Sequence, residues 1–280
     1  MDIREPVHVQ GWHAELDLGF ERRGARSVLA TRLHDGPLVV QKPLYPEGDA
    51  VCHTIIVHPP AGIAGGDELH LNIHAAKDAH ATLTTPGATK WYRSAGAWAR
   101  QRVDIDVASG ACVEWLPQEG IVFDRARARN EVTVSLAGDA TYIGWDLLCL
   151  GRAGSGERFT TGEYHMRTRI HREGRPVWFE SGLIPGAGTV RDSHAGLGGA
   201  TVCATLLAAS PRATRDDVAM CRALAPSAGR CAVTLLPELL IARYLGDSGE
   251  SARHYFTQLW RLLRPALLSR DVVLPRIWST

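Results

Sequence analysis

Apolar and polar side chains alternate along the chain as far as about residue 210. Successive side chains of a β-strand point to opposite faces, so this period of two predicts half-buried strands. In the first such run, polar residues or glycine separate Trp12, Ala14, Leu16, Leu18 and Phe20. Equivalent runs predict strands at residues 27–33, 38–41, 52–57, 68–74, 79–84, 101–107, 112–116, 132–136, 142–148, 163–170 and 177–181.

These short strands, separated by glycine, proline and aspartate turns, predict a mainly β fold of packed or coiled sheets. No helical period interrupts them, which argues against alternating βαβ units. The sequence shows no repeat of fixed period, so the pattern alone does not favour a simple solenoid.

The pattern changes in the last part of the chain. Residues 216–224 predict a short helix that begins near Thr214 or Arg215, residues 230–235 predict a strand, and residues 239–245 predict a helix. Ser248 is a candidate N-cap for a longer amphipathic helix that we expect to end at Pro265. We therefore expect one domain over residues 1–280, β-rich over 1–210 and helix-containing over 211–280.

An aromatic stripe follows one face of that last helix, and it has two interpretations. Its members recur at steps of three and four residues, and they include Tyr255, Phe256, Leu259 and Trp260. The stripe either packs on the sheets of this chain or, in part, binds a partner protein, because aromatic anchors dominate many interfaces.

Composition and charge narrow the class of protein. Hydrophobic residues make up 45% of the chain and the net charge is +1, values that are ordinary for a globular protein and give no field that favours nucleic acid or an anionic membrane. The six cysteines contain no C-x-x-C pair, which excludes a zinc ribbon and indicates no disulfide scaffold. We expect neither a secretory signal nor a membrane span, and hence a cytoplasmic location.

Motifs of common enzyme classes are absent from the sequence. It contains no G-x-S-x-G, H-E-x-x-H or S-x-x-K motif. The glycine-rich runs GRAGSGERF and AGIAGGDEL lack the lysine and the following helix of a phosphate-binding loop, so they predict tight turns.

One strand face carries potential metal ligands. Glu68, His70 and His74 share one parity with Asn72, and imidazole and carboxylate groups suit zinc or nickel. Alternate residues on a strand lie about 7 Å apart, too far for one tight site without a third partner. The face is therefore a solvated strand surface, a loose row of ligands for metal transit, or part of a metal-dependent hydrolase.

Two further segments place acids beside apolar residues. Glu119 lies in WLPQEGIVFDRARA, and Asp146 lies inside the apolar run GWDLLCLGR. A buried carboxylate is costly unless it is paired or hydrated, so Asp146 is either a paired structural acid or a functional acid facing a cavity.

Four segments in order, HPPAGIAGGDEL, TTPGATKWYRS, WLPQEGIVFDRARA and GWDLLCLGRAGSGERF, resemble the signature segments of the urease accessory protein UreD family, called UreH in some species. The likeness runs from about Gly11 through residues 196–208 and more weakly to the end. Two positions depart from the family pattern: Ala61 stands where the HPPGG loop usually has glycine, and Gly120 follows PQE in place of a β-branched or polar residue.

The resemblance implies a β-rich chaperone, not an enzyme, that helps to insert nickel into urease. It implies binding to UreF, to the GTPase UreG through UreF, and to apo-urease, with nickel in transit and no permanent cofactor. It places six polar positions near an internal nickel route: Asp67, Thr84, Thr85, Glu119, Asp146 and Glu180. On this interpretation Glu68, His70 and His74 are secondary, and a pure scaffold through which no metal passes is a further alternative.

Overall fold

The computed structural model describes residues 11–279, which form two large sheets. The seven-stranded sheet has the order β15-β14-β12-β9-β6-β1-β2, with β1 at His13–Arg23, β2 at Arg26–Asp35, β6 at Glu68–Ala75, β9 at Ala99–Val107, β12 at Arg127–Leu136, β14 at Glu163–Arg172 and β15 at Arg175–Pro185. The 11-stranded sheet follows the path β17-β18-β16-β13-β10-β7-β4-β3, with β3 at Val39–Val40, β4 at Cys52–Val57, β7 at His80–Thr84, β10 at Cys112–Leu116, β13 at Thr141–Leu150, β16 at Val202–Ala209, β17 at Arg230–Leu236 and β18 at Leu239–Gly246. Three short strands complete it beside β13: β5 at Gly62–Ile63, β8 at Thr89–Trp91 and β11 at Gly120–Val122.

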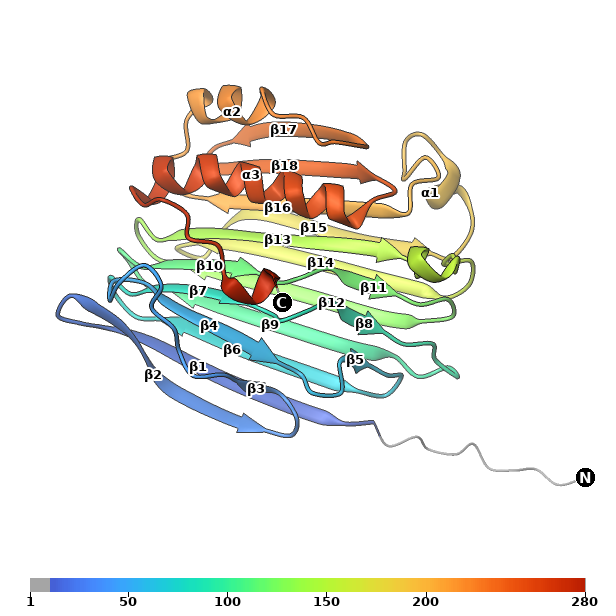
Figure 1. The fold of residues 1–280 in the computed structure, drawn as a ribbon, viewed down its shortest axis with the longest axis horizontal. Helices are drawn as coiled ribbons and strands as arrows, with labels where there is room; N and C mark the ends of the chain where they lie inside the picture. The colour runs from blue at the N-terminus through green and yellow to red at the C-terminus, as the bar shows by residue number, and fades with distance from the viewer. Residues whose placement is uncertain (1–10, 280) are drawn as a thin grey trace, which may run out of the picture.

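The middle of the chain is a stack of coils, as in a β-solenoid (Figure 1). Each coil runs from the larger sheet through a short strand to the smaller sheet, as in β4-β5-β6, and the next coil, β7-β8-β9, pairs with it in parallel. Cys52, Ala81, Val113 and Tyr142 occupy equivalent places in successive coils. These four positions hold different residue types and lie 29 to 32 residues apart, so the coils repeat in structure without an exact repeat in the sequence. The predicted mainly β fold of coiled sheets is confirmed.

The main core fills the space between the two sheets. Leu16, Leu71 and Val103 point inward from neighbouring strands of the smaller sheet, and Leu83 and Val113 point inward from the larger one, each 3% exposed or less. Full burial of such a side chain contributes about 1.5–3 kcal/mol, so the alternation read from the sequence is also the main source of stability.

Helix α3, at Gly249–Leu268, covers the outer face of β13, β16 and β18 (Figure 1). The remaining helices are α1 at Thr189–Asp192 and α2 at Arg215–Arg222, with the 3₁₀ turns η1 at Ala153–Ser155 and η2 at Arg276–Ser279. Thr214 caps α2 in a capping box and Ser248 accepts a hydrogen bond from Ser251 N, so both predicted helix starts are confirmed.

Two predictions for the last part of the chain are wrong, and one strand was missed. Residues 239–245 lie in strand β18, whose two faces are both largely buried, so its apolar run has lost the period of two. Strand β16 has the same character and was not predicted. Helix α3 continues through Pro265 to Leu268, where Ser269 adopts a left-handed conformation and ends it.

The aromatic stripe of α3 packs on the chain's own sheet. Tyr255, Phe256, Leu259 and Trp260 are each at most 1% exposed and belong to a second apolar cluster with Trp145 and Leu206. The expectation that these four residues bind a partner is therefore corrected, because their side chains are core.

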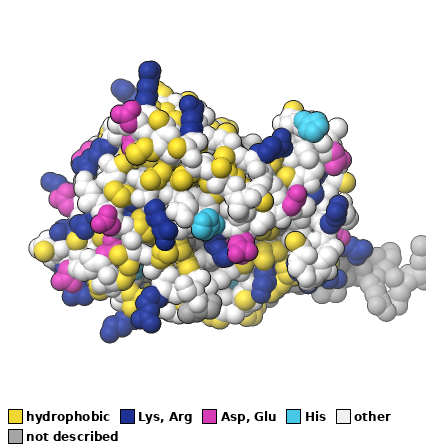
Figure 2. Space-filling model, turned by 45° about the horizontal axis from the view of Figure 1, so that its top comes forward, with side chains coloured by type: hydrophobic (Ala, Val, Ile, Leu, Met, Phe, Trp, Pro, Cys, Tyr) yellow, Lys and Arg dark blue, Asp and Glu magenta, His cyan; other side chains and the backbone are white. Residues whose placement is uncertain are grey.

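Basic and acidic side chains of the described residues are interspersed on the face shown in Figure 2. Within residues 11–279, no helix combines the length and apolarity needed to cross a membrane.

Candidate functional site

Asp146 and Glu180 meet in the space between the two sheets. Asp146 shares the inward parity of Tyr142 and Leu148 on β13, and Glu180 shares that of Ile184 on β15. Two residues far apart in sequence thus enter one interior region because each replaces an apolar side chain at an inward position of its strand.

The two acids interact electrostatically. Burial and, secondly, the negative charge of Glu180 raise the pKa of Asp146 to about 6, although a hydrogen bond with Asn130 opposes this. Asn130 Oδ1 in turn accepts from Gln101 Nε2 at 3.2 Å. A chain of polar side chains therefore crosses the otherwise apolar interior: Gln101 of β9, Asn130 of β12, Asp146 of β13 and Glu180 of β15.

Three adjoining hollows lie along this chain of polar side chains, between the sheets. The loop hollow, about 270 Å³, is lined by His58, Thr85 and Lys90; the narrow hollow, about 50 Å³, by Asn130 and Tyr164; and the wide hollow, about 570 Å³, by His194 and Arg230. The loop and narrow hollows share Thr89, Gln101, Trp115 and Pro117. The narrow and wide hollows share Asp146, Met166, Glu180 and Thr205. The acid pair thus lies in the wall where two hollows adjoin.

The chemistry of this wall suits weak binding of a divalent cation. Carboxylate, amide and hydroxyl oxygens come from Asp146, Glu180, Asn130 and Thr205. Such oxygen ligands hold borderline metals less firmly than thiolates do. Cys203 lines the wide hollow, but burial raises its pKa to about 12, which keeps it a protonated thiol.

Of the other four route candidates, only Thr85 lines one of these hollows. Its Oγ1 accepts from Gln118 N at 3.0 Å and donates to Gly87 O at 3.1 Å. The structure thus brings Asp146 and Glu180 together and places Thr85 in the loop hollow, at the other end of the three hollows.

Asp67, Thr84 and Glu119 lie outside the three hollows and have partners elsewhere. The Asp67 carboxylate accepts from Trp12 N and Ala64 N, both at 2.8 Å. Thr84 Oγ1 donates to Leu116 O at 2.6 Å and accepts from Trp278 Nε1 at 2.8 Å. Glu119 lies 3.5 Å from Arg253 Nη1.

The row of Glu68, His70 and His74 lies on the outer face of the smaller sheet. Each pairs with a different residue of β9: Glu68 with Arg100, His70 Nε2 with Asp104 at 2.8 Å, and His74 Nδ1 with Asp106 at 3.1 Å. Across residues 11–279, no three His, Cys, Asp or Glu side chains are arranged to hold a metal ion. The structure therefore holds Glu68, His70 and His74 in three separate ion pairs and does not gather them into one group.

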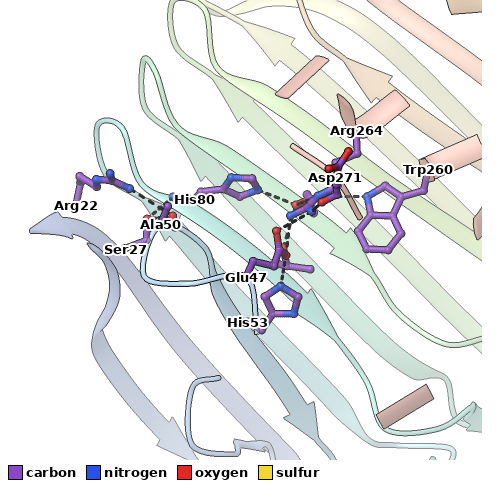
Figure 3. A network of polar contacts seen from close by, with 11 residues as sticks. Arg22, Ser27, Glu47, Ala50, His53, His80, Trp260, Arg264 and Asp271 are labelled. Atoms are coloured by element: carbon purple, nitrogen blue, oxygen red, sulfur yellow. Dashed lines mark hydrogen bonds and ion pairs between the residues drawn. The ribbon is translucent and has the colours of Figure 1, made fainter. Parts of the chain in front are cut away.

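The sequence reading missed a buried ionic network between α3 and the solenoid (Figure 3). Arg264 of α3 and Glu114 of β10 are both fully buried, and Arg264 Nε donates to Glu114 at 3.1 Å. Arg264 Nη2 also donates to Glu47 at 2.8 Å, while Trp260 Nε1 donates to Glu114 at 2.6 Å and His80 Nε2 lies 2.7 Å from it. Together these contacts fasten the C-terminal helix to two coils.

Two features of the sequence could have revealed this network. Glu114 interrupts an apolar strand as Asp146 does, and Trp260 and Arg264 are four residues apart on one helix face. Burial alone raises the pKa of Glu114, but its hydrogen bond with His80 and the charges of His80 and Arg264 outweigh that and lower the pKa to about 2.

Comparison with known proteins now identifies the family. The family described as "UreD urease accessory protein" matches residues 13–279. The chain is 53% identical over 284 residues to the urease accessory protein UreD of Dechloromonas aromatica (strain RCB), covering 100% of this chain and 99% of the relative. It is 55% identical over 270 residues to the urease accessory protein UreD of Azoarcus sp. (strain BH72), covering 96% and 95%. These relatives are named as accessory proteins and not as enzymes, and over nearly its whole length the chain belongs to the UreD urease accessory protein family.

Proposed function

We propose that this chain is a maturation chaperone that delivers nickel to apo-urease through the space between its two sheets. Family membership supports a role in urease maturation. The observation that carries the nickel route is the position of Asp146 and Glu180 in the wall between the narrow and wide hollows.

The proposed route is narrower than the set of residues that sequence resemblance implies. It runs along the three hollows, with Thr85 near one end and the acid pair near the other. Two carboxylates supply the charge that a desolvated dication needs, and too few ligands surround them to retain it, which suits transit. Asp67, Thr84 and Glu119 are assigned to structural contacts instead, the last of them with Arg253 of α3.

The proposed partners are UreF, UreG through UreF, and apo-urease. Co-expression of the chain with these proteins, followed by a pull-down on the chain, tests the assembly. Recovery of UreF and urease subunits is the expected result. A chain that is soluble and folded but recovers none of them would contradict the proposed partners.

The double variant Asp146→Asn/Glu180→Gln tests the route. We expect urease activity in co-expressing cells to fall roughly 10–100-fold, the usual effect of disturbing residues around a metal, while the pull-down stays intact. A matched control, Asp106→Asn/Glu131→Gln, removes two acids from the outer face of the smaller sheet. Normal activation by the route variant would contradict nickel transit past this pair and favour a pure scaffold.

A further inference from the structure

Arg243 is the cationic partner of the acid pair. It lies on β18 and lines the wide hollow, and its side chain is 45% exposed. Its Nη1 donates to Glu180 at 2.8 Å and to Thr205 Oγ1 at 3.2 Å, and its guanidinium lies 5.9 Å from the ring of Trp178. A positive charge therefore already pairs with one of the two carboxylates in the wall between the hollows.

We propose that Arg243 is an internal counter-cation that competes with the travelling metal ion for Glu180 and so prevents its retention. The proposal rests on the proposed nickel route and names a residue that sets how tightly the route binds its cargo. Arginine stays protonated at any physiological pH, so its charge is always present as a competitor.

The surroundings of Arg243 allow it to give way. Its half-exposed side chain borders a hollow of about 570 Å³, which leaves room for the guanidinium to move aside when a dication binds Asp146 and Glu180. Arg264 provides the contrast: it is fully buried and bound by two carboxylates and the Asp271 carbonyl oxygen. The first arrangement suits exchange and the second suits permanent fastening.

Nickel binding to the purified full-length chain tests the proposal without urease. Equilibrium dialysis against Ni²⁺ at pH 7.5 and low ionic strength compares the wild type with Arg243→Met, which keeps an unbranched, flexible side chain and removes its charge. We expect roughly tenfold tighter binding, the effect of removing one nearby positive charge from a partly exposed site. Adding Glu180→Gln to Arg243→Met should abolish the gain.

The matched control is Arg167→Met, which releases Glu131 on the outer face from an arginine of similar exposure. Unchanged affinity in Arg243→Met, or the same gain in Arg167→Met, would overturn the proposal. Thermal unfolding of each variant verifies that it is folded, and Arg243→Lys, which keeps the charge, should bind as weakly as the wild type.

The two proposals fail in different ways. Unchanged nickel affinity in Arg243→Met alongside failed urease maturation by Asp146→Asn/Glu180→Gln would remove only the role of Arg243. Normal maturation by the double variant would remove the route itself.

Discussion

Glu114 shows how one residue can fasten distant parts of this chain. The carboxylate has no exposed surface and accepts hydrogen bonds from α3 and from β7. Charges buried in this way cost free energy unless geometry and hydrogen bonds compensate them, and here Arg264, Trp260 and Thr82 do so.

This arrangement predicts acid sensitivity. The folded chain protonates Glu114 only at a pH of about 2, whereas its ordinary pKa is 4.5, so between these values the unfolded chain binds more protons. The stabilisation is fully present above pH 4.5 and is lost as the pH falls toward 2, by on the order of 3 kcal/mol. The pKa of Glu47 is lowered as well, by hydrogen bonds with His53 and Arg264 that outweigh its burial, so it adds to the same trend.

Denaturant unfolding between pH 2.5 and 6 measures the effect. In Glu114→Gln the fall in unfolding free energy on the acid side should be smaller than in the wild type. An equally steep fall in the variant would show that Glu114 is not the group responsible.

Ala61 offers a stabilising substitution. It adopts a φ of 60°, in the left-handed region, which costs a residue with a Cβ about 1–2 kcal/mol. Ala61→Gly removes that cost. Glycine also makes the unfolded chain more flexible, which stabilises the unfolded state by about 0.4–1 kcal/mol, so we expect the unfolding free energy to rise by about 0.5–1 kcal/mol in total. Thermal melts check this. Ala88 does not have a positive φ, so Ala88→Gly is the control. A lower melting temperature for Ala61→Gly would contradict the interpretation.

At the scale of elements, helix α3 is part of the core. Phe256 has no exposed surface and packs near Trp145, with ring centroids 6.3 Å apart. Phe256→Ala should therefore lower the unfolding free energy by about 3–5 kcal/mol. A variant with wild-type stability and lost partner binding would instead restore the docking role expected from the sequence.

The sequence predicted strands well where one face of the strand is buried and the other is exposed to solvent. Strand β6 alternates cleanly between Leu69, Leu71 and Ile73 and the polar side chains of the outer face, so its existence and parity are readable. Strands β16 and β18 are covered on both faces, by α3 and by the main core, and their apolar runs carry no period. The short strands β5, β8 and β11 are set by coil stacking and have too few residues to show a pattern.

The candidate site was only partly readable for a related reason. Asp146 was recognisable as an acid inside an apolar run, but its meeting with Glu180 depends on how the two sheets face each other. The roles of Asn130 and Arg243 arise from register between strands far apart in sequence, which single-strand patterns do not contain. Asp67 and Glu119 belong to recognisable motifs, yet their partners show contacts within turns and with α3.

At the scale of the whole molecule, the stacked coils create the row of hollows. Each coil adds one long strand to each sheet and a short strand to the larger one, and polar residues at inward positions line the hollows between the sheets. On the function proposed above, nickel travels along these spaces on its way to urease.

The most direct test is to fill the narrow passage without changing charge. Thr205 is 9% exposed and lines both the narrow and the wide hollow, so Thr205→Phe places a ring where the two adjoin. Ser181→Phe, which puts the same ring on the exposed side of β15 next to Glu180, is the control. Both variants must melt cooperatively and recover the partner proteins in a pull-down before they are compared.

The measurement is the nickel content of urease purified from cells that express each variant with the other accessory proteins. If nickel passes between the sheets, Ser181→Phe should yield urease with wild-type nickel content, and Thr205→Phe should yield urease with little nickel, as in cells lacking the chain. Urease fully loaded with nickel by a folded, assembled Thr205→Phe chain would show that the metal does not pass between the sheets.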